Sequence, residues 1–216
     1  MSQSSTAPTG TASSFGGTTV GEYLGALAAK VPAPGGGAVA ALHAAQGAAL
    51  VAMVARYTTR AKDAEHKPVV DRLIEAADAC RERALALADA DAAAFTAVGA
   101  AYKLPKESEG RAAAITEALV GAARVPAAVV DEADEVLSLA GELLPIGNPN
   151  VVTDIGAAAD AARAAATSSR LNIEINVASL DAVHGDEFAP VLLRIEALTA
   201  RADALHADVL HAVRSS

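Results

Sequence analysis

The chain has 216 residues, enough for one domain, and a formal net charge of −9 at pH 7. It has no basic stripe to neutralise phosphates, which argues against nucleic acid as a partner. Alanine occurs 57 times, aromatic residues make up 3% of the chain and tryptophan is absent. Because alanine has the highest helix propensity and small side chains let helix axes approach closely, this composition predicts an all-α fold.

The N-terminal segment and the cysteine content predict the domain boundary and the compartment. Residues 1–17 are rich in Ser, Thr and Gly and lack both a basic start and an apolar core. We therefore expect a disordered tail rather than a signal peptide, followed by one helical domain over residues 18–216.

The lone Cys80 cannot form an internal disulfide, which suits a cytoplasmic protein.

Caps and helix breakers along the chain predict six helices. Thr18 or Thr19 with Glu22 is a capping signal for the first helix, and Pro68 fits the first turn of the third. Pro126 is expected to kink or break the fourth. The expected helices cover residues 19–30, 36–59, 68–102, 108–142, 152–182 and 187–213. Together they predict a bundle of about five to six helices.

The second of these helices belongs to a segment, residues 31–55, that carries no charge. A membrane span would explain this, but the segment is mostly Ala and Gly, with His43 and Gln46 in its middle. It lacks the Leu, Ile and Phe content that favours insertion. A helix that is apolar all round also suits the centre of a bundle. We therefore expect a long buried Ala/Gly-rich central helix and no membrane partner.

One stretch, residues 171–177, alternates apolar and polar side chains and includes β-branched residues. This pattern locally favours a strand. A single strand in an otherwise helical chain would have no partner, so we interpret the stretch as helical.

A proline- and glycine-rich loop precedes the uncharged helix and ends in Gly35, Gly36 and Gly37. The first turn of a helix has unpaired N–H groups and a partial positive charge, so it is suited to hold an anion. The glycines would let such a ligand approach, and close packing would equally explain them. A dinucleotide fingerprint would need a preceding strand and a later acidic residue, and a phosphate loop would need Gly-Lys-Ser/Thr. Neither set is present.

Two acidic residues on the third helix are candidates for proton transfer. Asp89 and Asp91 point about 200° apart on a helix, so they cannot share one site as a pair. Asp91 instead shares a face with Phe95 and Tyr102. Partial desolvation there would raise the Asp91 pKa toward a useful range. The alternative is that both acids are solvated on a charged helix.

Asparagines and histidines complete the set of polar candidates. Asn148 lies in a turn shortly before Asp154, where a structural role is the default. Asn172 and Asn176 lie one helical turn apart, which fits either hydrogen bonding to a partner or a solvated face. The five histidines show no zinc-binding pattern, so no metal site is predicted, and His43 is expected to be a core histidine.

Six short motifs follow one another within residues 19–213. They are Pro32-Ala33-Pro34-Gly35-Gly36-Gly37-Ala38-Val39-Ala40-Ala41, Gly47-Ala48-Ala49-Leu50-Val51-Ala52-Met53-Val54, Asp91-Ala92-Ala93-Ala94-Phe95, Leu104-Pro105-Lys106, Gly147-Asn148-Pro149-Asn150-Val151-Val152-Thr153-Asp154 and Asn172-Ile173-Glu174-Ile175-Asn176. Each motif is weak alone. In this order and at these spacings they resemble the formiminotetrahydrofolate cyclodeaminase / methenyltetrahydrofolate cyclohydrolase family.

This resemblance implies a helical, dimeric enzyme that acts on one-carbon tetrahydrofolates without a metal or nucleotide cofactor. The implied reaction is hydrolysis of 5,10-methenyltetrahydrofolate to formyltetrahydrofolate, or conversion of 5-formiminotetrahydrofolate to 5,10-methenyltetrahydrofolate plus ammonia. The sequence does not choose between them. A non-catalytic folate-binding or scaffold relative with the same fold is the alternative.

The resemblance also assigns site residues. Asp91 would be the catalytic acid/base, since it holds the place four residues before Phe95, and Asp89 is the second candidate. The implied substrate-binding residues are Gly35, Gly36, Gly37, Lys106, Asn148, Asp154, Asn172 and Asn176. Two departures stand out. Ala38 replaces the family's usual Ser, and a Gly-Lys-Lys-like segment reads Thr59-Arg60-Ala61-Lys62 here.

Overall fold

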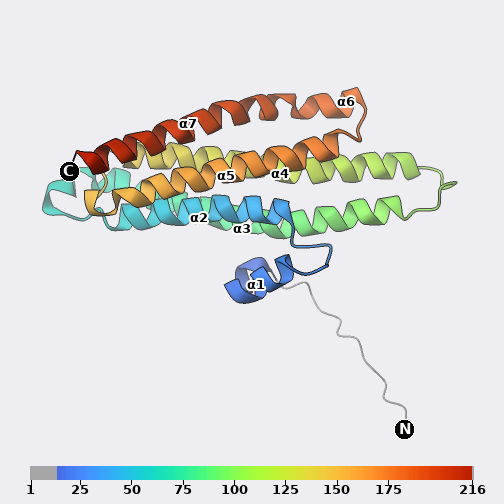
Figure 1. Ribbon diagram of the computed structural model, residues 1–216, viewed down its shortest axis with the longest axis horizontal. Coiled ribbons are helices and arrows are strands. Elements are labelled where there is room, and N and C mark those ends of the chain that lie inside the picture. Colours follow the sequence, from blue (N-terminus) through green and yellow to red (C-terminus); the bar gives the residue numbers. More distant parts are fainter. Residues whose placement is uncertain (1–13, 216) are drawn as a thin grey trace, which may run out of the picture.

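The computed structural model describes residues 14–215, in which no strand occurs. Five long helices lie side by side in an elongated bundle (Figure 1). They are α2 (Gly36–Arg56), α3 (Lys67–Tyr102), α4 (Arg111–Leu143), α5 (Val152–Val177) and α7 (Ala189–Arg214). The shorter elements are α1 (Val20–Leu27), α6 (Ala182–Gly185), η1 (Phe15–Gly17), η2 (Ala61–His66), η3 (Pro149–Val151) and η4 (Asp186–Phe188). The predicted all-α bundle is confirmed.

The helix ends follow the caps that the sequence contains. Thr19 and Glu22 form the predicted capping box of α1, in which each side chain accepts from the other residue's backbone N–H. Pro68 occupies the first turn of α3. Of the two outcomes expected at Pro126, a kink or a break, the break does not occur, because α4 continues through this residue. Pro126 is fully buried, so packing within the bundle holds the helix together despite the lost N–H.

Helix α2, which contains most of the uncharged segment, lies at the centre of the bundle, as the sequence predicts. It packs against α3, α4 and α5. The close approach of α2 to α4 and α5 depends on small residues. A Cβ at Gly47 would lie 3.0 Å from Val136 Cγ1 on α4 and 3.2 Å from the Ala158 carbonyl oxygen on α5. Alanines dominate the buried face of α2 for the same reason.

The strand-like stretch of residues 171–177 lies within α5, which confirms the helical interpretation. Leu171 and Ile175 are four residues apart and share an exposed face, with 68% and 69% of their surface accessible, whereas Ile173 between them is fully buried.

By length and composition alone, three helical segments of the described residues could cross a membrane: α2, the stretch Asp63–Tyr102 that contains α3, and α4. In the structure, 61% of the apolar window of α2 is buried inside the bundle. The absence of a membrane partner stays a prediction.

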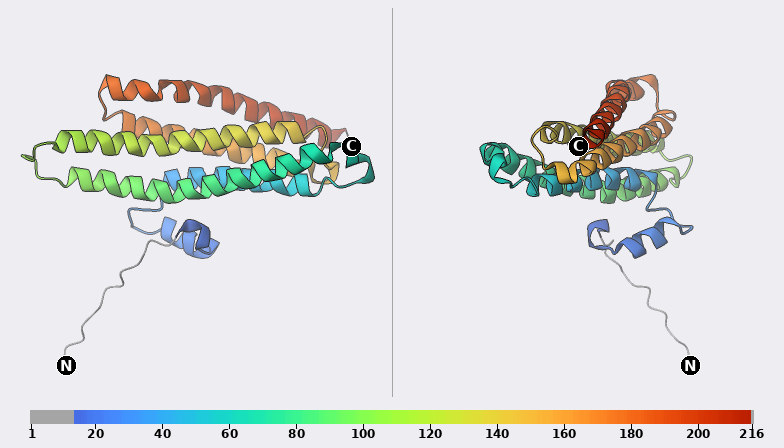
Figure 2. Two further views of the ribbon diagram at one scale, coloured as in Figure 1. Left: turned by 180° about the vertical axis from the view of Figure 1, so that it is seen from behind. Right: turned by 60° about the vertical axis from the view of Figure 1, so that its left-hand side comes forward.

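Helix α1 lies outside the bundle, below α2 and α3, in both Figure 1 and Figure 2. Residues 1–13, where most of the predicted tail falls, lie outside the described residues. Residues 14–17 were also assigned to the tail, but they form η1 and its cap and contact α3. The ordered part of the chain therefore begins earlier than residue 18.

Candidate active site

The glycine loop and α3 meet at Asp91, which lies beside the N-terminus of α2. Asp91 Oδ2 accepts a hydrogen bond of 3.1 Å from the Ala38 backbone N–H. A Cβ at Gly37 would lie 1.9 Å from Asp91 Oδ1, so only a glycine leaves room for the carboxylate at this place. The helix N-terminus therefore holds the carboxyl group of a side chain of the same protein, and Gly37 makes room for it, which is the close packing that the second interpretation of the loop predicts.

The environment of Asp91 favours its protonated form. Burial raises the pKa of the Asp91 carboxyl above its ordinary value of 3.8, and the hydrogen bond from Ala38 opposes this only in part. A half-buried carboxyl with a raised pKa is suited to accept and return a proton. The desolvation predicted for Asp91 from its helix face is thus present, although Phe95 and Tyr102 are themselves about half exposed.

Asp89, the second catalytic candidate, holds the N-terminal segment. Its Oδ2 accepts from Ser14 Oγ at 2.6 Å and its Oδ1 accepts from the Phe15 backbone N–H at 2.8 Å. The two acids therefore point to different partners, as their spacing predicts, and both carboxyl oxygens of Asp89 are engaged by η1 and its cap.

Asn172 lies against the same end of α2. A Cβ at Gly36 would be 3.7 Å from Asn172 Nδ2. Asn172 Nδ2 donates to the Ser168 carbonyl at 2.8 Å, and Asn176 Nδ2 donates to the Asn172 carbonyl at 2.7 Å. Each amide nitrogen is thus bonded within α5, which leaves the Oδ1 atoms available as acceptors.

The structure brings these residues together as one group, which we call the proximal group. It consists of Gly35, Gly36, Gly37, Asp91 and Asn172, with Asn176 one turn further along α5. Lys106 does not join it, because it is exposed in the loop after α3. The 11 residues from Asp91 to Tyr102 alone span roughly 17 Å of helix.

Asn148 and Asp154 lie at the opposite end of α2, and we call them the distal group. Asn148 Nδ2 donates to the Tyr57 carbonyl at 2.9 Å, and its backbone N–H donates to Thr58 Oγ1 at 3.1 Å. Asn148 Oδ1 accepts from the Asn150 N–H, so the turn role that the sequence suggests is present. The 21 residues of α2 separate the two groups by roughly 30 Å.

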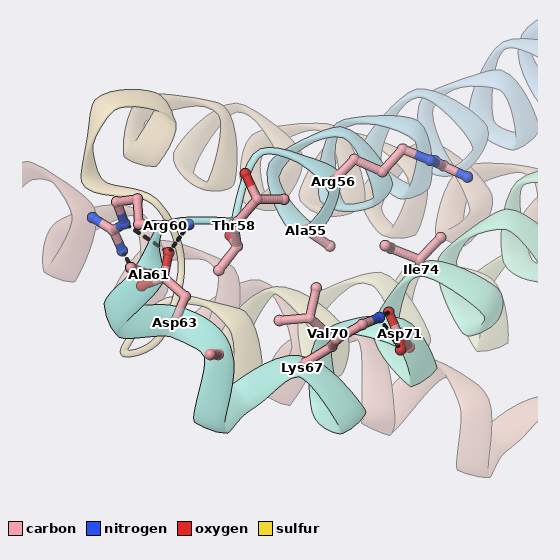
Figure 3. A pocket seen from close by; sticks show the side chains of 12 residues that line it. Ala55, Arg56, Thr58, Arg60, Ala61, Asp63, Lys67, Val70, Asp71 and Ile74 are labelled. Carbon is pink, nitrogen blue, oxygen red and sulfur yellow. Dashed lines mark hydrogen bonds and ion pairs between the residues drawn. The ribbon is translucent and has the colours of Figure 1, made fainter.

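A pocket of about 420 Å³ lies near the distal group, with an apolar wall that includes Ala55, Val70 and Ile74 (Figure 3). Three residues of the segment that departs from the family pattern line it: Thr59, Arg60 and Ala61. Arg60 donates through Nε and an Nη to the two Asp63 oxygens at 2.7 and 2.8 Å, and to the Gly147 carbonyl at 3.1 Å. Arg60 therefore ties η2 to the turn that carries Asn148.

One residue of the proximal end was not predicted from the sequence. Tyr23 on α1 is half-buried, and its pKa is raised by burial and by the negative charge of Asp91. Its Oη is enclosed and has no hydrogen-bond partner. The only signal was an aromatic residue in a capped helix just before the glycine loop, which is too common to single out.

These features, a helical bundle with a carboxylate seated on the glycine turn of its central helix, define the class. The chain belongs to the formiminotransferase-cyclodeaminase family, whose model matches residues 19–188. It is similar to a methenyltetrahydrofolate cyclohydrolase of Methylorubrum extorquens, with 37% identity over 93% of this chain and 98% of the relative. It is also similar to the mouse formimidoyltransferase-cyclodeaminase, with 34% identity over 74% of this chain but only 30% of that protein.

A solved structure shares the fold. The formiminotetrahydrofolate cyclodeaminase of Thermotoga maritima superposes with a TM-score of 0.80 and 28% identity, covering 93% of this chain and 98% of that one. The resemblance drawn from the six motifs is thereby confirmed.

Proposed function

We propose that this protein is an enzyme of tetrahydrofolate one-carbon metabolism that hydrolyses 5,10-methenyltetrahydrofolate to formyltetrahydrofolate. The observation that carries the proposal is the Asp91 carboxyl, half-buried, of raised pKa and fixed by Ala38 and Gly37. The full-length similarity to a relative named methenyltetrahydrofolate cyclohydrolase supports this reaction ahead of its alternative.

The chemistry fits one acid/base. The methenyl carbon is an amidinium carbon open to attack by water. As the new C–O bond forms, ionised Asp91 accepts a proton from the water. A C–N bond to that carbon then breaks, the departing nitrogen takes a proton and the added oxygen becomes the formyl oxygen. One proton is released overall, and general acid/base catalysis of this kind contributes on the order of 10²–10⁴-fold. No electron is transferred, so the proposal includes no redox cofactor.

The second candidate reaction is cyclodeamination of 5-formiminotetrahydrofolate. In that reaction N10 attacks the formimino carbon and ammonia leaves after protonation, so Asp91 would serve as the proton donor. The similarity to the Thermotoga maritima protein, which is named for this activity and has a comparable length, favours keeping it as a candidate.

We also propose that the chain forms a homodimer through the open face of α2. Six residues of α2 that the bundle leaves partly or fully exposed follow one another at spacings of three and four: Gly36, Val39, His43, Gln46, Leu50 and Met53. The exposed Arg56 continues this line at the C-terminal end of the helix. A seam of this spacing is typical of helix-to-helix contacts. From Gly36 to Met53 this line carries no charge, which favours a second copy over solvent.

A two-fold dimer can pair α2 with the partner's α2 in antiparallel orientation. The start of each α2 would then lie beside the end of the other. This arrangement would bring the distal group of one subunit to the proximal group of its partner, across the roughly 30 Å that separates them within one chain. We propose that the folate site is composed in this way, with Asp91 from one subunit and Asn148 and Asp154 from the other.

The test of the reaction is loss of 5,10-methenyltetrahydrofolate absorbance with purified protein, corrected for hydrolysis in buffer. We expect enzyme-dependent loss, and a fall of about 10²-fold or more in Asp91→Asn, which keeps the size and the acceptor for Ala38. Full activity of Asp91→Asn would refute the assignment. No acceleration by the wild type would direct the test to 5-formiminotetrahydrofolate and ammonia release. Folate binding without turnover of either substrate would favour the non-catalytic alternative.

A further inference from the structure

Helix α3 runs beyond the start of α2 and carries an exposed aromatic ring there (Figure 1). Asp91 lies beside Ala38, in the first turn of α2, and α3 continues for 11 more residues to Tyr102. Phe95 follows Asp91 by one helical turn on the same face, and 56% of its surface is accessible. Because α2 begins only at the level of Asp91, it does not cover the Phe95 ring.

The other end of α3 contributes to an open apolar pocket, the one of about 420 Å³ in Figure 3, which we call the distal pocket. Val70 and Ile74 of α3 and Ala55 of α2 form its apolar wall. Two cations at its rim, Arg56 and Lys67, are already paired with acidic side chains of α3. The distal pocket therefore suits an uncharged ring better than an anion.

Phe95 and the distal pocket adjoin opposite ends of the α2 seam that we propose as the dimer interface. Arg56 continues the line of the seam and also lines the pocket. At the other end, Gly36 begins the seam, and Ala38 holds the Asp91 carboxyl one turn before Phe95. The exposed ring and the open pocket are thus the two apolar features of α3 that flank this seam.

The two features also lie at matching heights. A two-fold axis that pairs α2 with an antiparallel copy passes near Gln46, the midpoint of Gly36–Arg56. Ala38 lies eight residues before Gln46, so Asp91 is roughly 12 Å along the helix direction from the axis and Phe95 roughly 18 Å. Ala55 lies nine residues after Gln46, roughly 14 Å away, and the pocket extends past it to η2. The two-fold operation therefore brings the ring of one subunit to the level of the pocket of the other. The two α3 helices fall on the same side of the paired α2 helices.

We propose that the Phe95 ring of each subunit docks into the distal pocket of a second copy of this chain. The inference rests on the proposed function, because it supplies the contact that sets the register of the antiparallel dimer. Two identical contacts form in each dimer. Asp91, one turn before Phe95, then lies beside the distal group of the other subunit, as the composite folate site requires.

The first test is cross-linking between cysteines placed at the two features. Phe95→Cys and Ile74→Cys are combined in one chain and treated with a short bismaleimide. The native Cys80 is fully buried, so only the introduced thiols react. Residues 74 and 95 are 21 positions apart on one helix, roughly 31 Å, so a short linker joins only different subunits. We expect a covalent dimer of twice the chain mass on a denaturing gel.

Two matched pairs test whether the contact is specific. Tyr102→Cys with Ile74→Cys moves the thiol roughly 10 Å further along α3, and we expect little cross-linking. Leu24→Cys with Ile74→Cys tests the other exposed apolar side chain near this end, since Leu24 on α1 is 54% exposed. Cross-linking from Phe95→Cys that is no faster than from Tyr102→Cys, or faster cross-linking from Leu24→Cys, would overturn the proposal.

The second test measures the dimer itself. Phe95→Ala should raise the dimer dissociation constant by at least about tenfold, because each dimer loses two docked rings, whereas Tyr102→Ala should leave it near the wild-type value. Turnover of Phe95→Ala should be low in dilute enzyme and recover as the concentration rises. An unchanged dissociation constant in Phe95→Ala would overturn the docking and leave the reaction standing. A cross-linked wild-type-like dimer without activity on either folate substrate would instead refute the proposed function alone.

Discussion

The Asp91 carboxylate occupies the space in which a side chain at Gly37 would begin. A Cβ there would lie 1.9 Å from Asp91 Oδ1 and 2.4 Å from Cγ. The neighbouring glycines are different: a Cβ at Gly36 would make only ordinary contacts with Asn172, and one at Gly35 would meet nothing within 4 Å. Of the three glycines, Gly37 is the one that the carboxylate requires.

Gly37→Ala should therefore displace Asp91 and abolish most of the turnover. Forcing a methyl group into this contact should also reduce the free energy of unfolding by about 1–3 kcal/mol. Gly99→Ala is the control, because Gly99 also lies in a helix and a Cβ there meets nothing within 4 Å. The test measures turnover and the free energy of unfolding in denaturant for both variants. Wild-type kinetics in Gly37→Ala would mean that the position of Asp91 is not critical.

The raised Asp91 pKa gives a pH dependence with a defined sign. In hydrolysis Asp91 must be ionised to accept the proton of water, so kcat/KM should rise with pH. The midpoint of that rise should lie above the ordinary carboxyl pKa of 3.8. Initial rates corrected for spontaneous hydrolysis, measured across the acid range, test this. A midpoint at or below 3.8 would contradict the assignment of Asp91.

The stability of the fold should also depend on pH through the Asp91 carboxyl, but it should fall with rising pH where kcat/KM rises. Because the pKa is raised in the folded state, the protonated form contributes stability at low pH, and this contribution is lost as the pH rises through the folded-state pKa. Asp91→Asn is neutral at every pH. Its melting temperature should therefore match the wild type near pH 3.5 and equal or exceed it at pH 7. A variant less stable than the wild type at pH 7 alone would show that ionised Asp91 stabilises the fold.

The proposed interface predicts the effect of one charge on α2. Gln46 is exposed in the middle of the uncharged seam, so Gln46→Arg should convert a dimer of twice 21.5 kDa into monomer. Ala204→Arg on exposed α7, at the other side of the bundle, should leave the mass unchanged. Light scattering after size-exclusion chromatography measures the molecular mass of both variants. A wild type that is monomeric at all concentrations would refute the interface.

A site shared between subunits predicts complementation. Asp91→Asn damages the proximal group and Asp154→Asn the distal group, so a mixed dimer contains one site with both groups intact. After unfolding and refolding together, the mixture should recover about a quarter of wild-type activity. Mixing Asp91→Asn with Gly37→Ala, which damages the same group twice, should recover none. Equal recovery in both mixtures would exclude the composite site.

Much of the architecture could be predicted because it depends on local chemistry. Alanine content predicts helices, Thr19 and Glu22 cap the first one, and an uncharged segment is buried at the centre. That α4 continues unbroken through Pro126 could not be predicted, because it depends on burial against neighbouring helices, which outweighs the missing hydrogen bond.

The partial burial of Asp91 could be predicted from the sequence, and the layout of the candidate site could not. The face that Asp91 shares with Phe95 and Tyr102 gave desolvation as one of two interpretations, and in the structure Asp91 is half-buried. That Asn148 lies a full helix length away depends on the directions in which α2 and α5 run, which motif order does not encode. The hydrogen bond from Arg60 to the Gly147 carbonyl likewise depends on how separate segments dock.

The alanine-built interior changes which mutations this protein can tolerate. Most buried side chains on α2 are a single methyl group, so truncation removes little and opens little space. Enlargement is different, since Gly47 already faces Val136 and the Ala158 carbonyl at contact distance, and the surrounding helices would have to separate. Deep mutational scanning of the buried positions of α2 should therefore show that any added carbon is poorly tolerated, whereas Ala→Gly changes there should cost mainly helix propensity, about 1 kcal/mol each.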